Sequence, residues 1–199
     1  MSSIRAKCDA LLRAYQDKGQ DPAAELLPPV SDAEIRALMK WFPAPIPEPL
    51  RELYSWRNGQ PKDAWESKHV FWFRDMQFTS LQRAAFEYRS MMESYGSVDA
   101  DNIKYHGIAL ATSFPFASFN GGWYVIPCAP HTIDRTHPLP VVGVMEGVDV
   151  YFHSLEKMLD TCIDWRKHST WEGDGWKLSE SMEMEIWRRH NPGIFGAAI

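Results

Sequence analysis

The sequence has few cysteines, no excess of basic charge and no long apolar run, and each of these absences narrows its function. Its three cysteines, Cys8, Cys128 and Cys162, lie far apart in 199 residues. An odd number without paired spacing argues against a disulfide framework and favours a reducing compartment. The net charge of −5 argues against direct binding of nucleic acid, because lysine and arginine supply most of the affinity for phosphates. A basic protein partner fits this charge better.

No segment approaches the run of about 18 apolar residues that marks a membrane-spanning helix. Charged residues interrupt the stretch MSSIRAKCDALLRAYQDKG at residues 1–19. This stretch therefore lacks the apolar core of a secretory signal peptide. We expect a cytoplasmic protein that does not bind a membrane.

Recognisable catalytic and metal-binding motifs are missing as well. The sequence NGG at residues 120–122 matches neither phosphate-binding glycine pattern, and a β-prone run follows it where an anion site would need a helix. It predicts a turn between two strands. The spacing of Cys128, His131 and His137 matches no common zinc site. We expect no enzymatic activity, metal or cofactor, although an active site assembled from distant residues stays an alternative.

Apolar periodicity and capping residues predict helices, then a sheet, then helices. One helix is predicted at residues 2–18, and a second follows a capping box formed by Ser31 and Glu34. Later helices are expected within residues 46–59, from a cap at Thr79, and after Ser154 and Ser179. The β-prone runs lie at 69–73, 107–113, 123–127 and 139–153. This order predicts an α+β fold with a single, mostly antiparallel sheet flanked by helices.

Two segments combine acidic side chains with tryptophan, of which the chain has nine. Residues 171–185 carry five acids and one lysine, and residues 63–75 mix acids with aromatic residues. A solvated helix face and half-buried core tryptophans would explain the same pattern. Exposed acids beside aromatic anchors are also what a binder of a basic protein needs. The predicted partner-binding residues are Asp63, Trp65, Glu66, Glu172, Asp174 and Trp176.

Three stretches in order resemble the SUKH superfamily. They are LPPVSDAEIRALMKWFPAPIPEPLRELYSWRNG at 27–59, GIALATSFPFASFNGGWYVIP at 107–127, and VVGVMEGVDVYFHSLEKMLDTCIDW at 141–165. One departure is Trp123, an aromatic residue where the family has a third small residue. The motif residues match scaffold positions, so the resemblance assigns no catalytic residue.

The resemblance implies a curved sheet and three parts of the chain. These are an N-terminal helical extension at 1–26, a SUKH-like domain at 27–168, and a C-terminal helical extension at 169–199 packed on the same domain. It also implies an immunity protein that binds and neutralises a cognate antibacterial toxin. A nuclease effector with a basic domain is the expected toxin, blocked at its active site or substrate entry. The alternative is an intracellular regulatory or scaffold module without a toxin partner.

Overall fold

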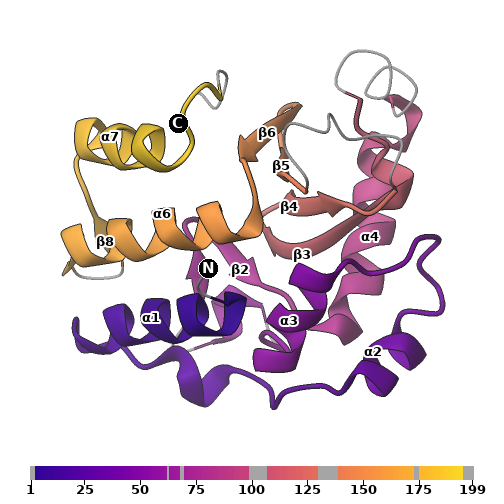
Figure 1. Cartoon of the computed structure of the whole chain (residues 1–199), viewed down its shortest axis with the longest axis horizontal. Helices are drawn as coiled ribbons and strands as arrows, with labels where there is room; N and C mark the ends of the chain where they lie inside the picture. The colour runs from indigo at the N-terminus through magenta and orange to yellow at the C-terminus, as the bar shows by residue number, and fades with distance from the viewer. Residues whose placement is uncertain are drawn as a thin grey trace.

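The computed structural model describes residues 3–61, 63–67, 70–98, 107–129, 139–172 and 175–194 (Figure 1). Its α-helices are α1 (Ile4–Gln16), α2 (Asp32–Leu38), α3 (Glu48–Trp56), α4 (Leu81–Tyr95), α6 (Leu155–His168) and α7 (Glu180–His190). Short 3-10 helices are η1 (Pro22–Glu25), η2 (Ala64–Glu66), η3 (Gly96–Val98) and η4 (Leu110–Thr112). The strands are β1 (Trp72–Phe73), β2 (Met76–Phe78), β3 (Ser113–Phe119), β4 (Gly122–Pro127), β5 (Val141–Val144), β6 (Val148–Phe152), β7 (Thr170–Glu172) and β8 (Gly175–Lys177).

The first six strands form one antiparallel sheet in which each strand pairs with the next along the chain. The register shifts between Pro115 and Ala117 and again between Val141 and Val142. Such bulges bend a strand and increase its twist. The predicted α+β fold with a single curved, mostly antiparallel main sheet is confirmed. The small β7–β8 sheet was not predicted.

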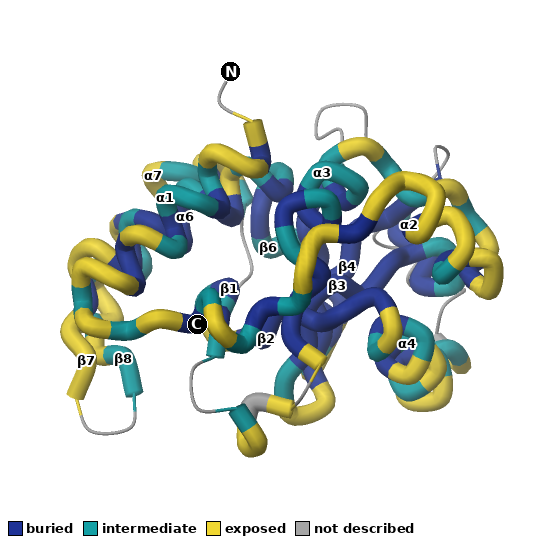
Figure 2. Tube along the Cα trace, turned by 90° about the horizontal axis from the view of Figure 1, so that it is seen from below, coloured by how far each residue is buried: buried dark blue, intermediate teal, exposed yellow. Residues whose placement is uncertain are grey.

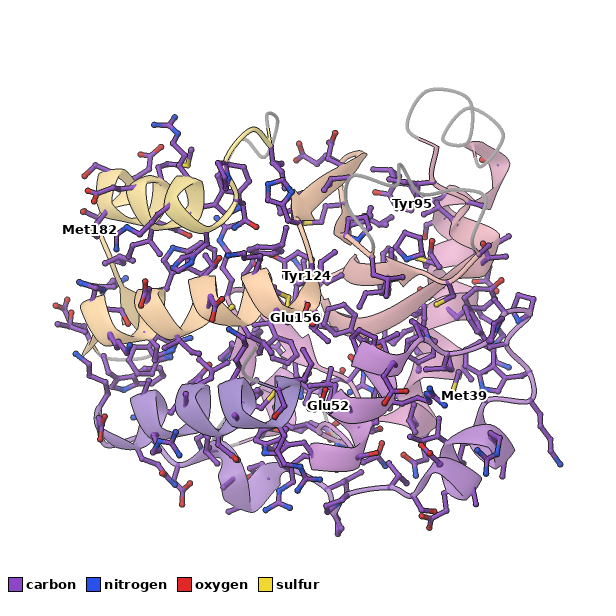
Figure 3. All side chains as sticks on the ribbon, in the orientation of Figure 1. Met39, Glu52, Tyr95, Tyr124, Glu156 and Met182 are labelled. Carbon is purple, nitrogen blue, oxygen red and sulfur yellow. The ribbon has the colours of Figure 1, made fainter. Side chains whose placement is uncertain are left out.

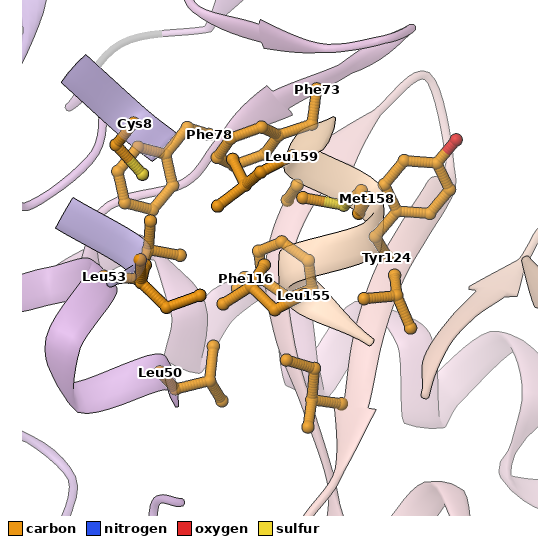
Figure 4. Packing of buried hydrophobic residues seen from close by; sticks show 14 of the residues in the cluster. Cys8, Leu50, Leu53, Phe73, Phe78, Phe116, Tyr124, Leu155, Met158 and Leu159 are labelled. Atoms are coloured by element: carbon orange, nitrogen blue, oxygen red, sulfur yellow. The ribbon is translucent and has the colours of Figure 1, made fainter. Parts of the chain in front are cut away.

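Helices cover both faces of the main sheet (Figures 1 and 2). In β4, Tyr124 and Ile126 join the core that α1, α3 and α6 share, whereas Trp123 and Val125 pack with Met91 of α4. All six residues of β4 are buried. A strand that is covered on both faces is expected to have a nearly continuous apolar sequence, as β4 does. Figure 4 shows the larger core, which brings together Cys8, Leu50, Leu53, Phe78, Phe116, Leu155 and Leu159.

The predicted capping box at the start of α2 is present. The Ser31 hydroxyl accepts a hydrogen bond from the Glu34 amide, and the Glu34 carboxylate accepts one from the Ser31 amide at 2.8 Å. Hydrogen bonds from Ser31 lower the pKa of Glu34, because they favour its ionised form. The sequence signal for this helix start was therefore sufficient.

Two predicted boundaries are wrong. The helix expected from a cap at Thr79 begins at Leu81 instead, because Thr79 continues the strand pairing and the Asn58 side chain accepts from the Leu81 amide at 3.0 Å. The β-prone run at 107–113 is mostly not a strand. The amide of Thr112 and the hydroxyl of Ser113 both donate to the carbonyl of Ala109, which turns the chain into η4 before β3 begins.

The three cysteines are free, buried thiols, and we predict that they do not react in the folded protein. Burial raises the pKa of Cys128 and of Cys162 to about 12, and that of Cys8 is also raised, chiefly by burial. Ellman's reagent near pH 8 should therefore modify all three only after denaturation, since the thiolate is the reactive form. A thiol that reacts equally fast in the folded and unfolded chains would contradict this burial.

The same pKa shifts predict how stability depends on pH. The folded state holds the thiol protons more tightly than the unfolded chain does. Their contribution to the free energy of unfolding is therefore fully present below the unfolded pKa of about 8.5. The free energy of unfolding should then fall as the pH rises from about 9 towards 12. Urea denaturation across this range measures it, and a flat profile would show that the thiols are not protected by burial.

Candidate partner-binding surface

Three hairpin turns of the main sheet lie together at one end. An antiparallel meander reverses direction at alternate ends, so its first, third and fifth turns share an end. Here these are the β1–β2, β3–β4 and β5–β6 turns, at residues 74–75, 120–121 and 145–147. All three contribute residues to one open hollow of about 770 Å³. Sheet topology therefore assembles a surface from segments about 70 residues apart in sequence.

This hollow, called the acidic hollow below, carries negative charge. Its walls include Asp75, Glu146 and Asp149, and none of the described residues that line it is Lys, Arg or His. The phenol of Tyr151 also lines the hollow, and the negative charge affects its pKa. Burial raises the pKa of Tyr151, the carboxylates of Asp75, Asp149 and Glu146 raise it further, and Arg74 opposes them. The hollow thus suits cationic side chains of a partner.

Tyr151, in the wall of the acidic hollow, packs on the backbone of β5 at Gly143. A Cβ atom on Gly143 would lie 2.5 Å from Cε2 of Tyr151, so the tyrosine ring lies directly against this bare stretch of β5. The β3–β4 turn closes one side. Asn120 and Gly121 have φ angles of 50° and 78°, the left-handed conformations that a tight two-residue hairpin turn requires. The predicted NGG turn is confirmed.

A second hollow, called the aromatic hollow below, also borders the β3–β4 turn and measures about 200 Å³. Its walls include Trp65, Phe86 and Phe119. Trp65 is 78% exposed and Phe86 60% exposed, and the Trp65 ring lies 5.0 Å from that of Phe119 between centroids. Large apolar side chains exposed together mark a site of interaction. Residues 119–121 line both hollows, which are therefore adjacent.

A buried carboxylate holds the wall of the aromatic hollow in place. Glu87 of α4 accepts hydrogen bonds of 2.9 Å from the Trp123 indole nitrogen and of 2.9 Å from Arg83. The same guanidinium nitrogen of Arg83 donates to Asp63 at 2.5 Å. Trp123, the aromatic residue that departs from the family pattern, thus links the sheet to α4 and, through Arg83, to Asp63.

The structure separates the predicted contact residues into two groups. Asp63, Trp65 and Glu66 lie at η2 with exposed side chains, and the first two line the aromatic hollow. Glu172 and Trp176 lie on the β7–β8 hairpin. No hydrogen bond, ion pair or ring contact within the described ranges joins the two groups.

The members of the second group differ among themselves. Glu172 is exposed, whereas Trp176 is half-buried with its ring 3.8 Å from the Arg166 guanidinium carbon. Asp174 lies outside the described residues. A role of either group in binding a partner stays a prediction. Sequence reasoning missed the residues of the acidic hollow and Phe86. The rule that alternate turns of an antiparallel meander share an end could have placed the residues of the acidic hollow at one end of the sheet.

Neither a metal-binding cluster nor a membrane-spanning helix is present among the described residues. In the described part of the chain, no group of three or more His, Cys, Asp or Glu side chains could hold a metal ion. His131 and His137 of the spacing considered above lie outside the described residues. No helix among the described residues is both long enough and apolar enough to cross a bilayer.

The exposed Trp65 and the buried Trp123 should differ in how much they contribute to the free energy of unfolding. Trp65→Ala should change the free energy of unfolding by no more than about 0.5 kcal/mol, because its ring is mostly exposed. Trp123→Ala should cost roughly 3–5 kcal/mol, because its buried ring fills the core against α4 and bonds Glu87. Urea denaturation of both variants measures the difference. Equal destabilisation would contradict the assignment of Trp65 to a free surface.

One family model matches this chain. It describes the SMI1/KNR4 family (SUKH-1) and covers residues 29–161, which include α2 to α4 and every strand of the main sheet. No curated protein gave a significant match. The match spans more than half of the chain and agrees with the three resembling stretches. The chain belongs to the SMI1/KNR4 family (SUKH-1).

Proposed function

We propose that this chain is an immunity protein that binds and neutralises a cognate antibacterial toxin, a nuclease effector with a basic groove. The family is known broadly for immunity and regulation and is generally non-catalytic. The observation that carries the proposal is the acidic hollow beside the exposed aromatic side chains of Trp65 and Phe86. This pairing has the chemistry of an interface with a basic protein.

In such an interface the aromatic residues and the acidic residues would have different roles. Trp65 and Phe86 would supply buried apolar anchors, which typically carry much of an interface's affinity. Asp75, Glu146 and Asp149 would occupy positions in the toxin where nucleic acid phosphates bind. Their negative field would also speed encounter with a basic groove. Access of substrate to the toxin would then be blocked without any reaction on this chain.

A tagged pull-down from the native organism tests the proposal. The expected result is a single basic toxin-domain protein that co-purifies at near-equal stoichiometry and loses its activity when the chain is added. Several host proteins at low occupancy would contradict the proposal and favour a regulatory or scaffold module. Failure to retain the toxin from toxin-expressing cells would also contradict it.

Charge reversal in the acidic hollow should weaken toxin binding. We expect Glu146→Lys with Asp149→Lys to reduce affinity on the order of 10- to 100-fold, mainly through slower association. The remaining affinity should depend less on salt, because attraction has been removed. Surface plasmon resonance at several salt concentrations separates the two rates.

The controls use the same change of charge elsewhere. Asp17→Lys alters an exposed acid at the end of α1 that lines neither hollow, so affinity should not change. Glu172→Lys tests the predicted group on the β7–β8 hairpin. If Glu172→Lys lowered the affinity for the toxin and the double variant did not, the interface would lie on the β7–β8 hairpin and not at the acidic hollow.

A further inference from the structure

A separate cavity of about 250 Å³ lies between α6, the β1–β2 turn, the segment that follows β8, and α7. Arg74 and Arg166 both line it, together with Trp176 and Glu183. Cys162, Trp165 and Leu178 add apolar surface. A concave site with apolar walls and few polar groups is typical of small-ligand binding. The cavity shares only Asp75 with the acidic hollow.

Arg166 is a buried cation with no ion-pair partner among the described residues. Only 5% of its surface is exposed, and no Asp or Glu among the described residues forms an ion pair with it. Its guanidinium makes one side-chain hydrogen bond, in which Nη2 donates to the Tyr15 hydroxyl at 2.9 Å. Its Nε is buried without a partner.

Arg74 is fully compensated by comparison. Its Nε lies 2.7 Å from a Glu183 carboxylate oxygen, and Nη1 lies 3.8 Å from Asp75. Asp75 also accepts a hydrogen bond from Tyr124, which lies where the sheet meets the start of α6 (Figure 3). The two acids of the cavity wall therefore pair with Arg74, and neither forms an ion pair with Arg166.

Two aromatic rings pack against the guanidinium of Arg166. Its guanidinium carbon lies 4.3 Å from the Tyr15 ring centroid and 3.8 Å from that of Trp176. The two rings are nearly perpendicular to each other, with centroids 5.5 Å apart, so they approach the guanidinium from adjacent directions. They in part offset the cost of burying the charge. A guanidinium presents parallel N–H groups along its edges, which match the oxygens of a carboxylate or phosphate.

We propose that this cavity binds a small oxyanion, a carboxylate or a phosphate group, through Arg166. The ligand supplies an ion-pair partner for Arg166, which no described Asp or Glu provides, and Trp176 with the apolar wall covers its non-polar part. Arg74 and Glu183 tie the β1–β2 turn to α7 and so hold two walls of the site together. This inference does not depend on the proposed toxin partner.

The test is a titration of the purified chain with sodium acetate and, separately, with inorganic phosphate. Sodium chloride keeps ionic strength constant, so that screening does not imitate binding. The readout is the Nε–H resonance of Arg166 in a nitrogen-15 NMR spectrum, assigned with Arg166→Lys. We expect a saturable shift with at least one of the two anions. Saturation by acetate alone indicates that the site takes carboxylate ligands, and saturation by phosphate alone indicates phosphate ligands. Saturation by both indicates that the site recognises the oxyanion group that the two share.

Variants test whether Arg166 carries the binding. Because these variants lack the Arg166 Nε–H, the indole N–H resonance of Trp176, which lines the same cavity, reports their binding. Arg166→Met should reduce affinity by roughly tenfold or more. Arg166→Lys keeps the charge but loses the planar fork, and should also bind more weakly. Arg189→Met changes a half-exposed arginine of α7 outside the cavity and should bind as the wild type does. The proposal is overturned if neither anion shifts the wild-type resonance saturably, or if a folded Arg166→Met binds as tightly as the wild type.

Discussion

Burial of the main sheet on both faces is the constraint on which the rest of the structure depends. Helices α1, α3 and α6 cover one face and α4 covers the other, so β3 and β4 are buried almost throughout. A sheet covered in this way has no open face on which to build a binding site. Its exposed parts are its ends and edges, and the meander gathers three turns at one end. The surface that we propose for partner binding follows from this arrangement.

The same constraint explains the contrasting environments of the tryptophans. Trp123 points from β4 towards α4 and is buried, and its polar nitrogen needs an acceptor, which Glu87 provides. Trp65 belongs to a short 3-10 helix outside the sheet and contacts the ring of Phe119, while most of the Trp65 side chain is exposed to solvent. One residue type thus supports the scaffold in one place and offers contact area in the other.

Local signals predicted the parts of the fold that depend on neighbouring residues. The Ser31–Glu34 capping box and the NGG turn are each determined within a few residues, and both are present. The acidic hollow and the Arg166 cavity could not be read in this way. Each joins segments far apart in sequence, and the register and packing that bring them together are tertiary properties. For the same reason the predicted contact residues fell into two groups, since composition indicates a patch without indicating its neighbours.

The central claim is that the end of the sheet with the three turns is the partner-binding surface. Hydrogen–deuterium exchange of the chain, alone and bound to the toxin it captures, tests this most directly. We expect slower exchange on binding at residues 119–122 and 145–149, at the turns that line the acidic hollow. Slower exchange confined to the β7–β8 hairpin, with these turns unchanged, would contradict it.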